Sequence, residues 1–338
     1  MNGWQLVVVE PGRIEVQALE LDENLKPNEA LVQSEYTIVS AGTEGAGFTG
    51  LVKEMPFGDA GQYPRTTGYG NLGRVLSVGS GVSMCKPGDR VLSFSRHASL
   101  VKADAGRMAL PVSAKDPGQH LVFTRMAGVS IAALRSSIVQ PGDTVVVIGM
   151  GLVGNFAAQL FQQAGAEVMA VDLAQFRLDK AKACGIGRVV NASKENLEEA
   201  VKAWTGGKGA HVVVEAIGRS EVIAQAVMLT RRYGEVILLG SPRAKATFDA
   251  TPMLLRLHLE AIRMIGALEW RWPQHGTERV RDLTANYRML AQWISGGRLQ
   301  VAPLLTHLAT PDQCQQIYDG LIGNKEEFLG AVFDWGQG

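Results

Sequence analysis

The first hundred residues alternate apolar and polar side chains in short runs, which Gly, Pro and Asp separate. Alternation with a period of two favours half-buried strands, and the Pro-Gly-Asp stretch at Pro87–Asp89 favours a turn. The pattern predicts a β-rich first region, with strands at Trp4–Glu10, Arg13–Glu20, Glu29–Ser40, Gly73–Val82 and Asp89–Phe94.

The pattern changes beyond residue 120. His120–Val139 has Ala-rich helical spacing, and apolar runs then alternate with amphipathic segments. Continuous Val/Ile strands between amphipathic helices are typical of a doubly wound parallel sheet. The predicted strands are Thr144–Gly149, Glu167–Asp172, Arg188–Val190, His211–Gly218 and Glu235–Gly240, and the predicted helices are Asn155–Gly165, Ala174–Gly185, Ser193–Gly206 and Ser220–Gly234.

The last part of the chain is mixed again, with a predicted helix around Arg281 to Ser295 and a final strand at Gly330–Trp335. A chain of 338 residues exceeds the usual size of one hydrophobic core, so we predict two domains. Residues 1–120 and 268–338 form a β-rich domain in this layout, and residues 121–267 form an inserted α/β domain.

Composition narrows the possible partners. Lys plus Arg equals Asp plus Glu, at 33 each, and a neutral chain lacks the basic excess that nucleic acids and anionic membranes attract. The apolar runs are too short for a secretion signal or a membrane span, so we expect a cytoplasmic protein. Cys85, Cys184 and Cys314 are scattered, which disfavours a disulfide framework or a Cys-x-x-Cys metal site.

Two glycine runs have the G-x-G-x-x-G spacing that holds dinucleotide phosphates, Gly68–Gly73 and Gly149–Gly154. Only the second follows a predicted strand and opens a helix. Its first glycine permits the tight turn, its second lets the backbone reach a pyrophosphate, and its third lets helix pack on strand. The predicted cradle is Gly149, Gly151, Leu152, Val153 and Gly154.

Cofactor choice depends on the end of the next strand. Asp172 stands there, where a carboxylate binds ribose hydroxyls and repels a 2′-phosphate, so NAD is favoured over NADP. Arg177 could still assist an NADP phosphate. The Gly68–Gly73 run instead leads directly into a strand and offers no helix N-terminus, so we expect no second nucleotide site.

The chain resembles the medium-chain dehydrogenase/reductase superfamily, the zinc alcohol and polyol dehydrogenases and their zinc-free relatives. The resemblance covers nearly every segment, with the stretches "VSAGTE", "TTGYGNLGRVLSVGSGVSMCKPGDRV", "GMGLVG", "VVVEAIG", "VILLGSP", "MIGA" and "LGAVFDW". It implies an α/β fold with a GroES-like β-rich catalytic domain and a Rossmann cofactor domain.

The resemblance also implies that the usual zinc ligands are missing. Ala41, Tyr69, Gly70 and Arg125 occupy the ligand positions, and catalytic zinc needs three thiolate, imidazole or carboxylate ligands. The four-Cys lobe of a structural zinc is absent as well, because "SRHASLVKADAG" follows "PGDRVLSF" directly. We therefore expect a zinc-free branch, with an unorthodox Glu44–His97 metal site as the alternative.

Without a metal, hydrogen-bond donors or a general acid must stabilise the oxygen that gains charge during hydride transfer. The resemblance places Thr43 on the substrate hydroxyl, the Tyr69 phenol where zinc would lie, and Glu44 as a group that orients Arg125 or a water. A phenol has a pKa near ~10, so acid–base work near neutrality would need a nearby cation such as Arg125 or Lys102. The predicted catalytic set is Thr43, Glu44, Tyr69, His97 and Arg125.

Each of these residues also has a structural interpretation. Tyr69 could fill space that the metal leaves, Thr43 could bond its own backbone, and Glu44 could be a structural ion-pair partner. His97 could be a satisfied core histidine or a relay.

On the cofactor side, the resemblance places three short stretches. Ala216, Ile217 and Gly218 would lie by the adenosine, Gly240, Ser241 and Pro242 by the ribose and nicotinamide, and Gly266, Ala267 and Leu268 near the nicotinamide amide. Trp270 and Trp272 could stack on a cyclic substrate, or could belong to a packed strand at a dimer edge.

The leading hypothesis is a zinc-independent, NAD-dependent dehydrogenase of a secondary alcohol in a polyol, cyclitol or sugar derivative. The alternatives are an NAD(P)H-dependent enone or quinone reductase and a non-catalytic nucleotide-binding protein. We expect a small-molecule substrate, neither a nucleic-acid nor a membrane partner, and a homodimer or homotetramer.

Overall fold

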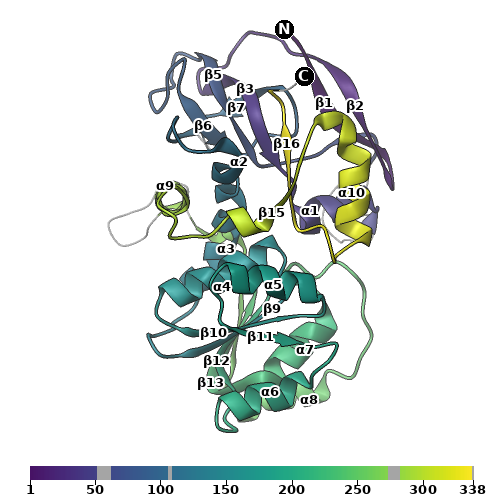
Figure 1. Ribbon diagram of the computed structural model, residues 1–338, viewed down its shortest axis with the longest axis vertical. Helices are drawn as coiled ribbons and strands as arrows, with labels where there is room; N and C mark the ends of the chain where they lie inside the picture. The colour runs from purple at the N-terminus through teal and green to yellow at the C-terminus, as the bar shows by residue number, and fades with distance from the viewer. Residues whose placement is uncertain (52–61, 106–108, 273–281, 337–338) are drawn as a thin grey trace. The chain divides into compact units, whose positions relative to one another are not determined.

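A computed structural model describes residues 1–51, 62–105, 109–272 and 282–336. The chain divides into two compact units, each described here by itself (Figure 1). The β-rich unit comprises residues 1–126 and 272–338, and the parallel-sheet unit comprises residues 127–271. The predicted divisions lay at residues 120/121 and 267/268.

The β-rich unit contains two sheets. One has the strand order β2-β1-β4, and the other has seven strands in the order β15-β16-β3-β5-β6-β8, with β7 paired to β3. The strands are β1 (Asn2–Glu10), β2 (Arg13–Glu20), β3 (Glu29–Ile38), β4 (Arg65–Thr66), β5 (Asn71–Val78), β6 (Arg90–Ser93), β7 (Leu100–Asp104), β8 (Ala109–Pro111), β15 (Leu305–Ala309) and β16 (Gly330–Asp334). The helices are α1 (Ala41–Phe48), α2 (Gly118–Leu121), α9 (Leu283–Ser295), α10 (Cys314–Gly323) and the short 3-10 helices η3 (Ala302–Leu304) and η4 (Pro311–Gln313).

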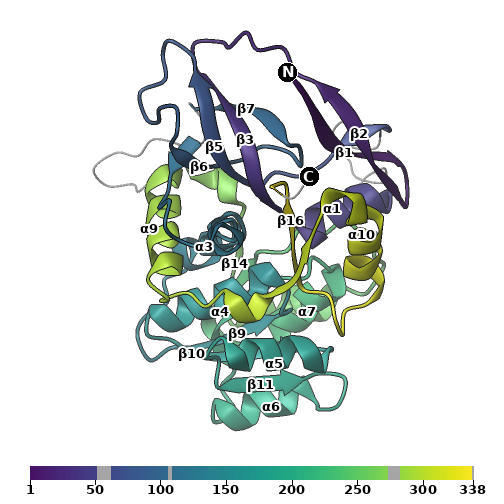
Figure 2. The same ribbon diagram turned by 45° about the horizontal axis from the view of Figure 1, so that its top comes forward.

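The end of the chain completes the sheet of the first part. β16 pairs antiparallel with β3, and Figure 2 shows it beside the purple strands. α10 lies against α1 (Figure 1). Phe48, Tyr318 and Phe333 share one buried apolar cluster. Segments nearly 300 residues apart along the chain therefore build one core around α1.

The parallel-sheet unit has a six-stranded sheet in the order β11-β10-β9-β12-β13-β14. All five neighbouring pairs are parallel. The strands are β9 (Thr144–Ile148), β10 (Glu167–Asp172), β11 (Arg188–Asn191), β12 (Ala210–Glu215), β13 (Thr230–Leu238) and β14 (Arg263–Gly266). The helices are α3 (Thr124–Ser136, which begins in the β-rich unit), α4 (Leu152–Gln163), α5 (Gln175–Ala183), α6 (Leu197–Trp204), α7 (Ser220–Leu229), α8 (Thr251–Leu259) and the 3-10 helix η2 (Glu269–Arg271).

Both faces of this sheet are buried, as its continuous apolar strands predict. Val145 and Val147 of β9 face a cluster that includes residues of α3, α4 and α5. Val146 and Ile148, between them, face a second cluster with residues of α6 and α7. Alternate residues of β9 thus face opposite helical layers, one on each side of the sheet, and the helices of these layers do not cover the ends of the strands.

Some predicted elements differ from the structure. The predicted helix Ser220–Gly234 is wrong at its end, because α7 stops at Leu229 and β13 begins at Thr230. Thr230 pairs with Ala210 whereas Glu235 pairs with Val212, so the intervening residues bulge out of register. The β-branched Thr230 fits the strand, and the Arg-Arg-Tyr stretch occupies the bulge.

Two helical predictions need smaller corrections. The stretch His120–Val139 forms two helices, α2 and α3, in place of one. The predicted helix near the C-terminal part is α9, and Arg281 at its proposed start lies outside the described residues.

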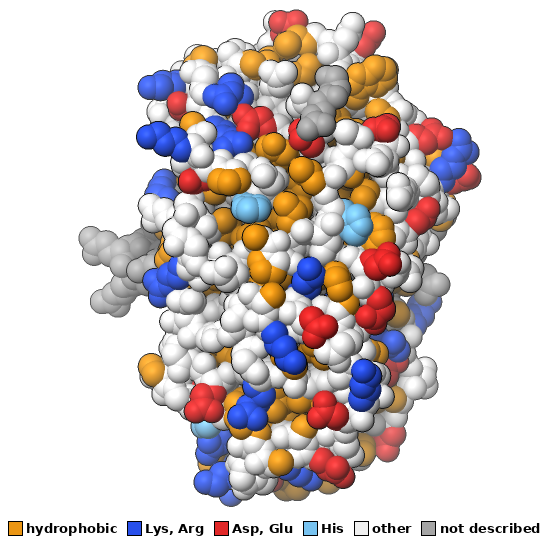
Figure 3. Space-filling model, in the orientation of Figure 1, with side chains coloured by type: hydrophobic (Ala, Val, Ile, Leu, Met, Phe, Trp, Pro, Cys, Tyr) orange, Lys and Arg blue, Asp and Glu red, His pale blue; other side chains and the backbone are white. Residues whose placement is uncertain are grey.

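Cationic and anionic side chains occur near one another on the face shown in Figure 3. Within the described ranges, no helix is both long and apolar enough to cross a membrane.

Candidate functional site

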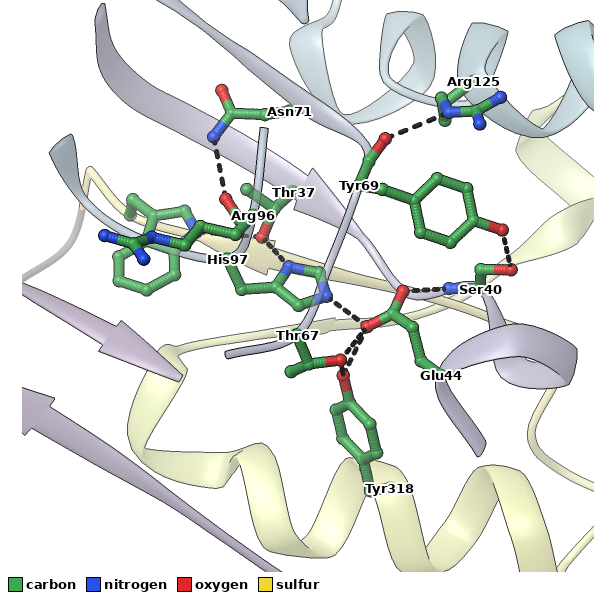
Figure 4. A network of polar contacts seen from close by, with 11 residues as sticks. Thr37, Ser40, Glu44, Thr67, Tyr69, Asn71, Arg96, His97, Arg125 and Tyr318 are labelled. Atoms are coloured by element: carbon green, nitrogen blue, oxygen red, sulfur yellow. Dashed lines mark hydrogen bonds and ion pairs between the residues drawn. The ribbon is translucent and has the colours of Figure 1, made fainter. Parts of the chain in front are cut away.

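The candidate catalytic residues of the β-rich unit come from segments that are distant in sequence (Figure 4). Glu44 lies on α1, and Ser40 is the residue directly before that helix. Tyr69 lies two residues before β5. His97 follows β6, and Arg125 lies in the first turn of α3. Thr43 lies on α1 too and is hydrogen-bonded to Tyr69. The fold thus gathers all five predicted residues, and adds Ser40, which the sequence did not single out.

Glu44 is buried, and donors surround its carboxylate. Oε1 accepts the Ser40 amide at 2.7 Å. Oε2 accepts the hydroxyls of Thr67 at 2.9 Å and Tyr318 at 2.6 Å, and lies 2.9 Å from His97 Nε2. Burial alone would raise the pKa of Glu44, but His97 and the hydrogen bonds outweigh it and hold the pKa below its ordinary value.

His97 connects Glu44 to Thr37 of β3. Its ring is fully buried, and Nδ1 lies 2.7 Å from the Thr37 hydroxyl. Thr37 Oγ1 also accepts the indole N–H of Trp335 at 2.9 Å. Both ring nitrogens of His97 are therefore occupied by protein groups, which agrees with the satisfied-histidine interpretation.

Glu44 forms an ion pair with His97. Its carboxylate oxygens also accept hydrogen bonds from Ser40, Thr67 and Tyr318. That Glu44 orients Arg125 or a water stays a prediction.

Arg125 lies among aromatic rings. Its guanidinium carbon is 4.5 Å from the ring centre of Tyr69, 4.4 Å from that of Phe94 and 5.8 Å from that of Tyr287. Nε donates to the Tyr69 carbonyl at 3.0 Å, and a terminal nitrogen donates to the Tyr287 hydroxyl. Cation–π attraction strengthens when the pair is desolvated, so these rings hold a buried positive charge beside the phenol.

Tyr69 is half-buried, and its hydroxyl donates to Ser40 Oγ. Burial raises its pKa above the ordinary value, although the Arg125 charge and hydrogen bonds with Ser40 and Thr43 work in the opposite direction. The nearby cation that the sequence called for is Arg125, but burial outweighs it, and Tyr69 keeps its proton near neutral pH.

Lys102 is not the cation beside Tyr69. Its Nζ donates to the Asn24 carbonyl at 2.6 Å and lies 3.7 Å from Asp22 Oδ2. Of the two cations that the sequence suggested, Arg125 is therefore the one that lies beside the phenol of Tyr69.

The residues of the predicted catalytic set differ in how exposed they are to solvent. Thr43 is exposed and Tyr69 is half-buried, so a substrate can reach both hydroxyls. Glu44, His97 and Arg125 are buried. The latter three act on a substrate only through neighbouring groups.

The Gly68–Gly73 run serves packing. Gly68 has a φ of +96°, and a Cβ there would lie 2.5 Å from the His97 amide nitrogen. A Cβ on Gly70 would lie 2.9 Å from the Arg125 side chain, and one on Gly73 would lie 2.3 Å from the Gln33 carbonyl. These glycines let Tyr69 and its neighbours approach one another, and β5 begins at Asn71 without a helix.

The residues at the metal-ligand positions do not fit zinc. A methyl group, a phenol, a glycine and a guanidinium stand at Ala41, Tyr69, Gly70 and Arg125. Elsewhere in the described part of the chain, no three His, Cys, Asp or Glu side chains gather as a metal site. Cys85, Cys184 and Cys314 are buried free thiols, and burial raises the pKa of Cys184 to about 12 and of Cys314 to about 11.

The glycine turn of the parallel-sheet unit has the predicted geometry. Gly149 follows β9 directly and has a φ of +98°, and a Cβ on Gly154 would lie 1.7 Å from the Gly149 carbonyl. A Cβ on Gly151 would meet nothing within 4 Å, so the backbone is open there. α4 begins at Leu152, and the amides of Leu152, Val153 and Gly154 precede its hydrogen-bond ladder.

Asp172 ends the neighbouring strand β10, beside this turn. Its Oδ2 accepts the Met150 amide at 2.7 Å, and its Oδ1 accepts the Ala174 amide at 3.0 Å. The carboxylate is thereby oriented next to the cradle. Arg177 lies on α5, and its buried Nε has no hydrogen-bond partner among the described residues.

Large apolar side chains are exposed at the carboxyl edge of this sheet. Leu173 follows β10 and is 66% exposed, Ile217 follows β12 and is 46% exposed, and Leu268 follows β14 and is 62% exposed. Ligands of open α/β sheets bind at this edge. The exposed apolar surface suits the flat rings of a dinucleotide.

Two further turns at the edge are packed backbone to backbone. Gly218 has a φ of +84°, and a Cβ there would lie 2.4 Å from the Ser241 carbonyl. A Cβ on Gly240 would lie 2.3 Å from the Gly218 amide. Ala216 and Ala267 are also tied to the strands, because their amides donate to the Ile148 and Leu238 carbonyls.

The tryptophans do not share one element. Trp270 lies in the 3-10 helix η2 and is 57% exposed, whereas Trp272 follows it and is partly buried. The alternative of a packed strand is wrong here, because β14 ends at Gly266. Pro273–Gly276, the rest of that stretch, lies outside the described residues. Trp270 belongs to the parallel-sheet unit and Trp272 to the β-rich unit.

The sequence-based reasoning missed several residues of these sites. In the β-rich unit these are Thr37, Ser40, Thr67, Phe94, Tyr287, Tyr318 and Trp335, and in the parallel-sheet unit it is Glu215. Only Glu215 had a usable local signal, since it ends a buried Val-rich strand and precedes a glycine by three residues.

Comparison with known proteins gives consistent matches. Residues 153–282 match the family model "Zinc-binding dehydrogenase". The chain is 24% identical to the zinc-type alcohol dehydrogenase-like protein YdjJ of Escherichia coli K12, over 98% of this chain and 99% of that protein. It is 30% identical to the erythritol/L-threitol dehydrogenase of Mycolicibacterium smegmatis, over 49% of this chain and 47% of that protein.

A solved structure shares the fold over nearly the whole chain. It is a predicted zinc-binding dehydrogenase of Sinorhizobium meliloti 1021 bound to NADP, with a TM-score of 0.82, 18% identity, and 99% of each chain covered.

Proposed function

Because the chain belongs to the medium-chain dehydrogenase/reductase superfamily, we propose that it is a zinc-independent, NAD-dependent oxidoreductase. The hydride would pass between nicotinamide and a secondary alcohol of a polyol, cyclitol or sugar derivative. The observation that carries the proposal is the pair formed by Tyr69 and Arg125, a protonated phenol beside a caged guanidinium at positions where metal ligands are expected.

The cofactor would occupy the carboxyl edge of the parallel sheet, where it would supply or accept the hydride. Gly149, Gly151 and the first amides of α4 suit its pyrophosphate. Asp172 suits unmodified ribose hydroxyls, which supports NAD. The NADP in the Sinorhizobium structure and the orphaned Arg177 Nε make NADP the second candidate.

The chain's own residues would manage the substrate oxygen. Tyr69 keeps its proton and can donate it to an oxygen that gains negative charge, and the Arg125 charge stabilises the phenolate that remains. Thr43, exposed and hydrogen-bonded to Tyr69, offers a second hydroxyl to the substrate. In the oxidative direction, the reverse of this step, the phenolate form of Tyr69, which the Arg125 charge stabilises, would accept the alcohol proton.

Similarity to the erythritol/L-threitol dehydrogenase supports a polyol among the possible alcohols. A panel of polyols, cyclitols and sugar derivatives, each with NAD or NADP, tests this through the absorbance of the reduced nicotinamide. We expect turnover of at least one compound with NAD. Turnover only of enones or quinones with NADPH would instead support the reductase alternative.

We also propose a homodimer or homotetramer. β14 lies at one edge of its sheet, and the side chains of Met264, Leu268 and Trp270 in and after it are exposed. Such an edge invites pairing with another strand. Light scattering coupled to size-exclusion chromatography should give a mass of two or four chains. A cytoplasmic location, and the lack of nucleic-acid and membrane partners, stay predictions.

A further inference from the structure

Glu215 is a buried acid at the cofactor edge that the proposed chemistry does not use. It is the last residue of β12, and its side chain is 0% exposed. Its Oε1 accepts the amides of Ile217 and Gly218, each at 2.8 Å. The side chain thus bends back and holds the turn that follows its own strand.

This turn contacts both other turns of the edge. The Ile217 side chain lies so close to Gly149 that a Cβ there would be 2.5 Å from Ile217 Cγ1. Gly218 lies equally close to the Ser241 backbone. The Glu215 carbonyl itself accepts the Leu239 and Gly240 amides, at 2.9 and 2.8 Å. Glu215 therefore links the glycine cradle, its own turn and the Gly240–Ser241 turn.

The two carboxyl oxygens of Glu215 are held unequally. Oε2 is buried and has no hydrogen-bond partner among the described residues. Burial raises the pKa of Glu215, although the backbone amides work in the opposite direction. A buried polar atom without a partner costs free energy, and such costs are typically retained at functional sites.

We propose that Glu215 is a positioning residue that sets the affinity for the nicotinamide dinucleotide. By holding the Ile217 and Gly218 amides, it keeps Ile217 against the Gly149 turn and Gly218 against the Ser241 turn. This inference rests on the proposed function, because it assumes that a nicotinamide cofactor binds at this edge.

The test compares two buried glutamates of one sheet. Glu235 of β13 is also buried, and its Oε2 accepts the Ile138 amide at 3.0 Å and the Ser137 hydroxyl at 2.6 Å. It sits nearer the opposite end of the strands, beside Val212 in the ladder. Glu235→Ala is therefore a matched control for loss of a buried carboxylate away from the cofactor edge.

The readouts are the Kd for NADH, from its fluorescence, and the Tm of the free protein. We expect Glu215→Ala to weaken NADH binding by about tenfold, the effect of roughly one hydrogen bond, and to raise the KM for the cofactor more than it lowers kcat. Glu215→Gln, which keeps an acceptor oxygen, should recover most of the affinity. Glu235→Ala should lower Tm and leave the Kd near that of the unchanged protein.

Three results would overturn the inference while leaving the proposed function intact. The first is an unchanged Kd for NADH in Glu215→Ala. The second is a loss of NADH affinity in both Glu215→Ala and Glu235→Ala that is proportional to the drop in Tm. The third is failure of Glu215→Gln to recover the affinity for NADH. If the Glu215 variants do not fold, hydrogen exchange of the unchanged protein provides the test. NADH should slow the exchange of the Ile217 and Gly218 amides. Exchange of these amides at the same rate with and without NADH would contradict the inference. Absence of any NADH or NADPH binding by the unchanged protein would instead refute the proposed function, and the inference with it.

Discussion

Each unit of the molecule buries one glutamate next to its candidate site, and the two are held in opposite ways. Glu44 receives donors on both oxygens and pairs with His97. Glu215 receives two amides on one oxygen, and its other oxygen has no partner among the described residues. The pKa of Glu44 is held low, whereas that of Glu215 is raised.

The difference teaches what each acid contributes. A fully satisfied buried carboxylate ties together the segments that bring its donors, and α1, α10 and the residues before β5 meet at Glu44. A half-satisfied one weakens the fold and orders only the turn that it holds. Glu44 therefore supports the segments around Tyr69, whereas Glu215 orders the turn at the edge where we propose that the cofactor binds.

The largest expected effect is loss of stability in Glu44→Ala. The substitution leaves His97, Thr67 and Tyr318 buried without their shared acceptor, and breaking a buried pair costs about 3–5 kcal/mol. Chemical denaturation, followed through the transition of the β-rich unit, measures the change. The control is Glu10→Ala in the same unit, which removes an exposed pair with Arg13 and should change stability only slightly. A change of that small size for Glu44→Ala would contradict a supporting role.

The next effect is on turnover. Tyr69→Phe keeps the ring against Arg125 and removes the hydroxyl that would donate to the substrate, so kcat should fall by about a hundredfold. The Tm should stay close to that of the unchanged protein, because Ser40 keeps its amide bond to Glu44. Steady-state kinetics with the best alcohol from the panel give the number. If kcat stays within about threefold, Tyr69 is no acid–base residue.

The smallest effect is the dependence of stability on pH, which sharpens the contrast directly. A free Glu has a pKa near ~4.3. The depressed pKa of Glu44 stabilises the fold above that value, and this stabilisation is lost as the pH falls through the folded-state pKa. The raised pKa of Glu215 has the opposite sign: its contribution is most favourable below ~4.3 and declines as the pH rises through the folded-state pKa.

The Glu215→Gln variant separates these two contributions. Measured against the unchanged protein, its relative stability should increase as the pH rises from about 4.5 toward 7, because the amide does not ionise. A difference between the two proteins that is flat over this range would show that Glu215 does not titrate as its burial implies.

Sequence patterns predicted the parallel sheet and its glycine cradle well. The strands of that sheet are continuous apolar runs, and the roles of Gly149, Gly151 and Gly154 follow from local geometry. By contrast α1, whose sequence "AGTEGAGF" contains three glycines, had no helical signal and was missed. Its helical form is favoured by tertiary packing on α10.

The Glu44 network was predictable only in part. Resemblance brought Glu44, Tyr69 and Arg125 forward, but the partners of Glu44 depend on contacts across the whole chain. Tyr318 lies 274 residues from Glu44 in sequence. A periodic pattern records which face of an element is buried, and it does not record which distant hydroxyl fills a carboxylate's remaining acceptor position.

Metal content of the active enzyme tests the central claim most directly. Purified protein that turns over an alcohol with NAD should be analysed for zinc by mass spectrometry and assayed after dialysis against a chelator. We predict zinc far below one atom per chain and unchanged kcat, because Tyr69 and Arg125 stand where the ligands would be. About one zinc per chain, with activity lost on chelation and restored by zinc, would contradict the account.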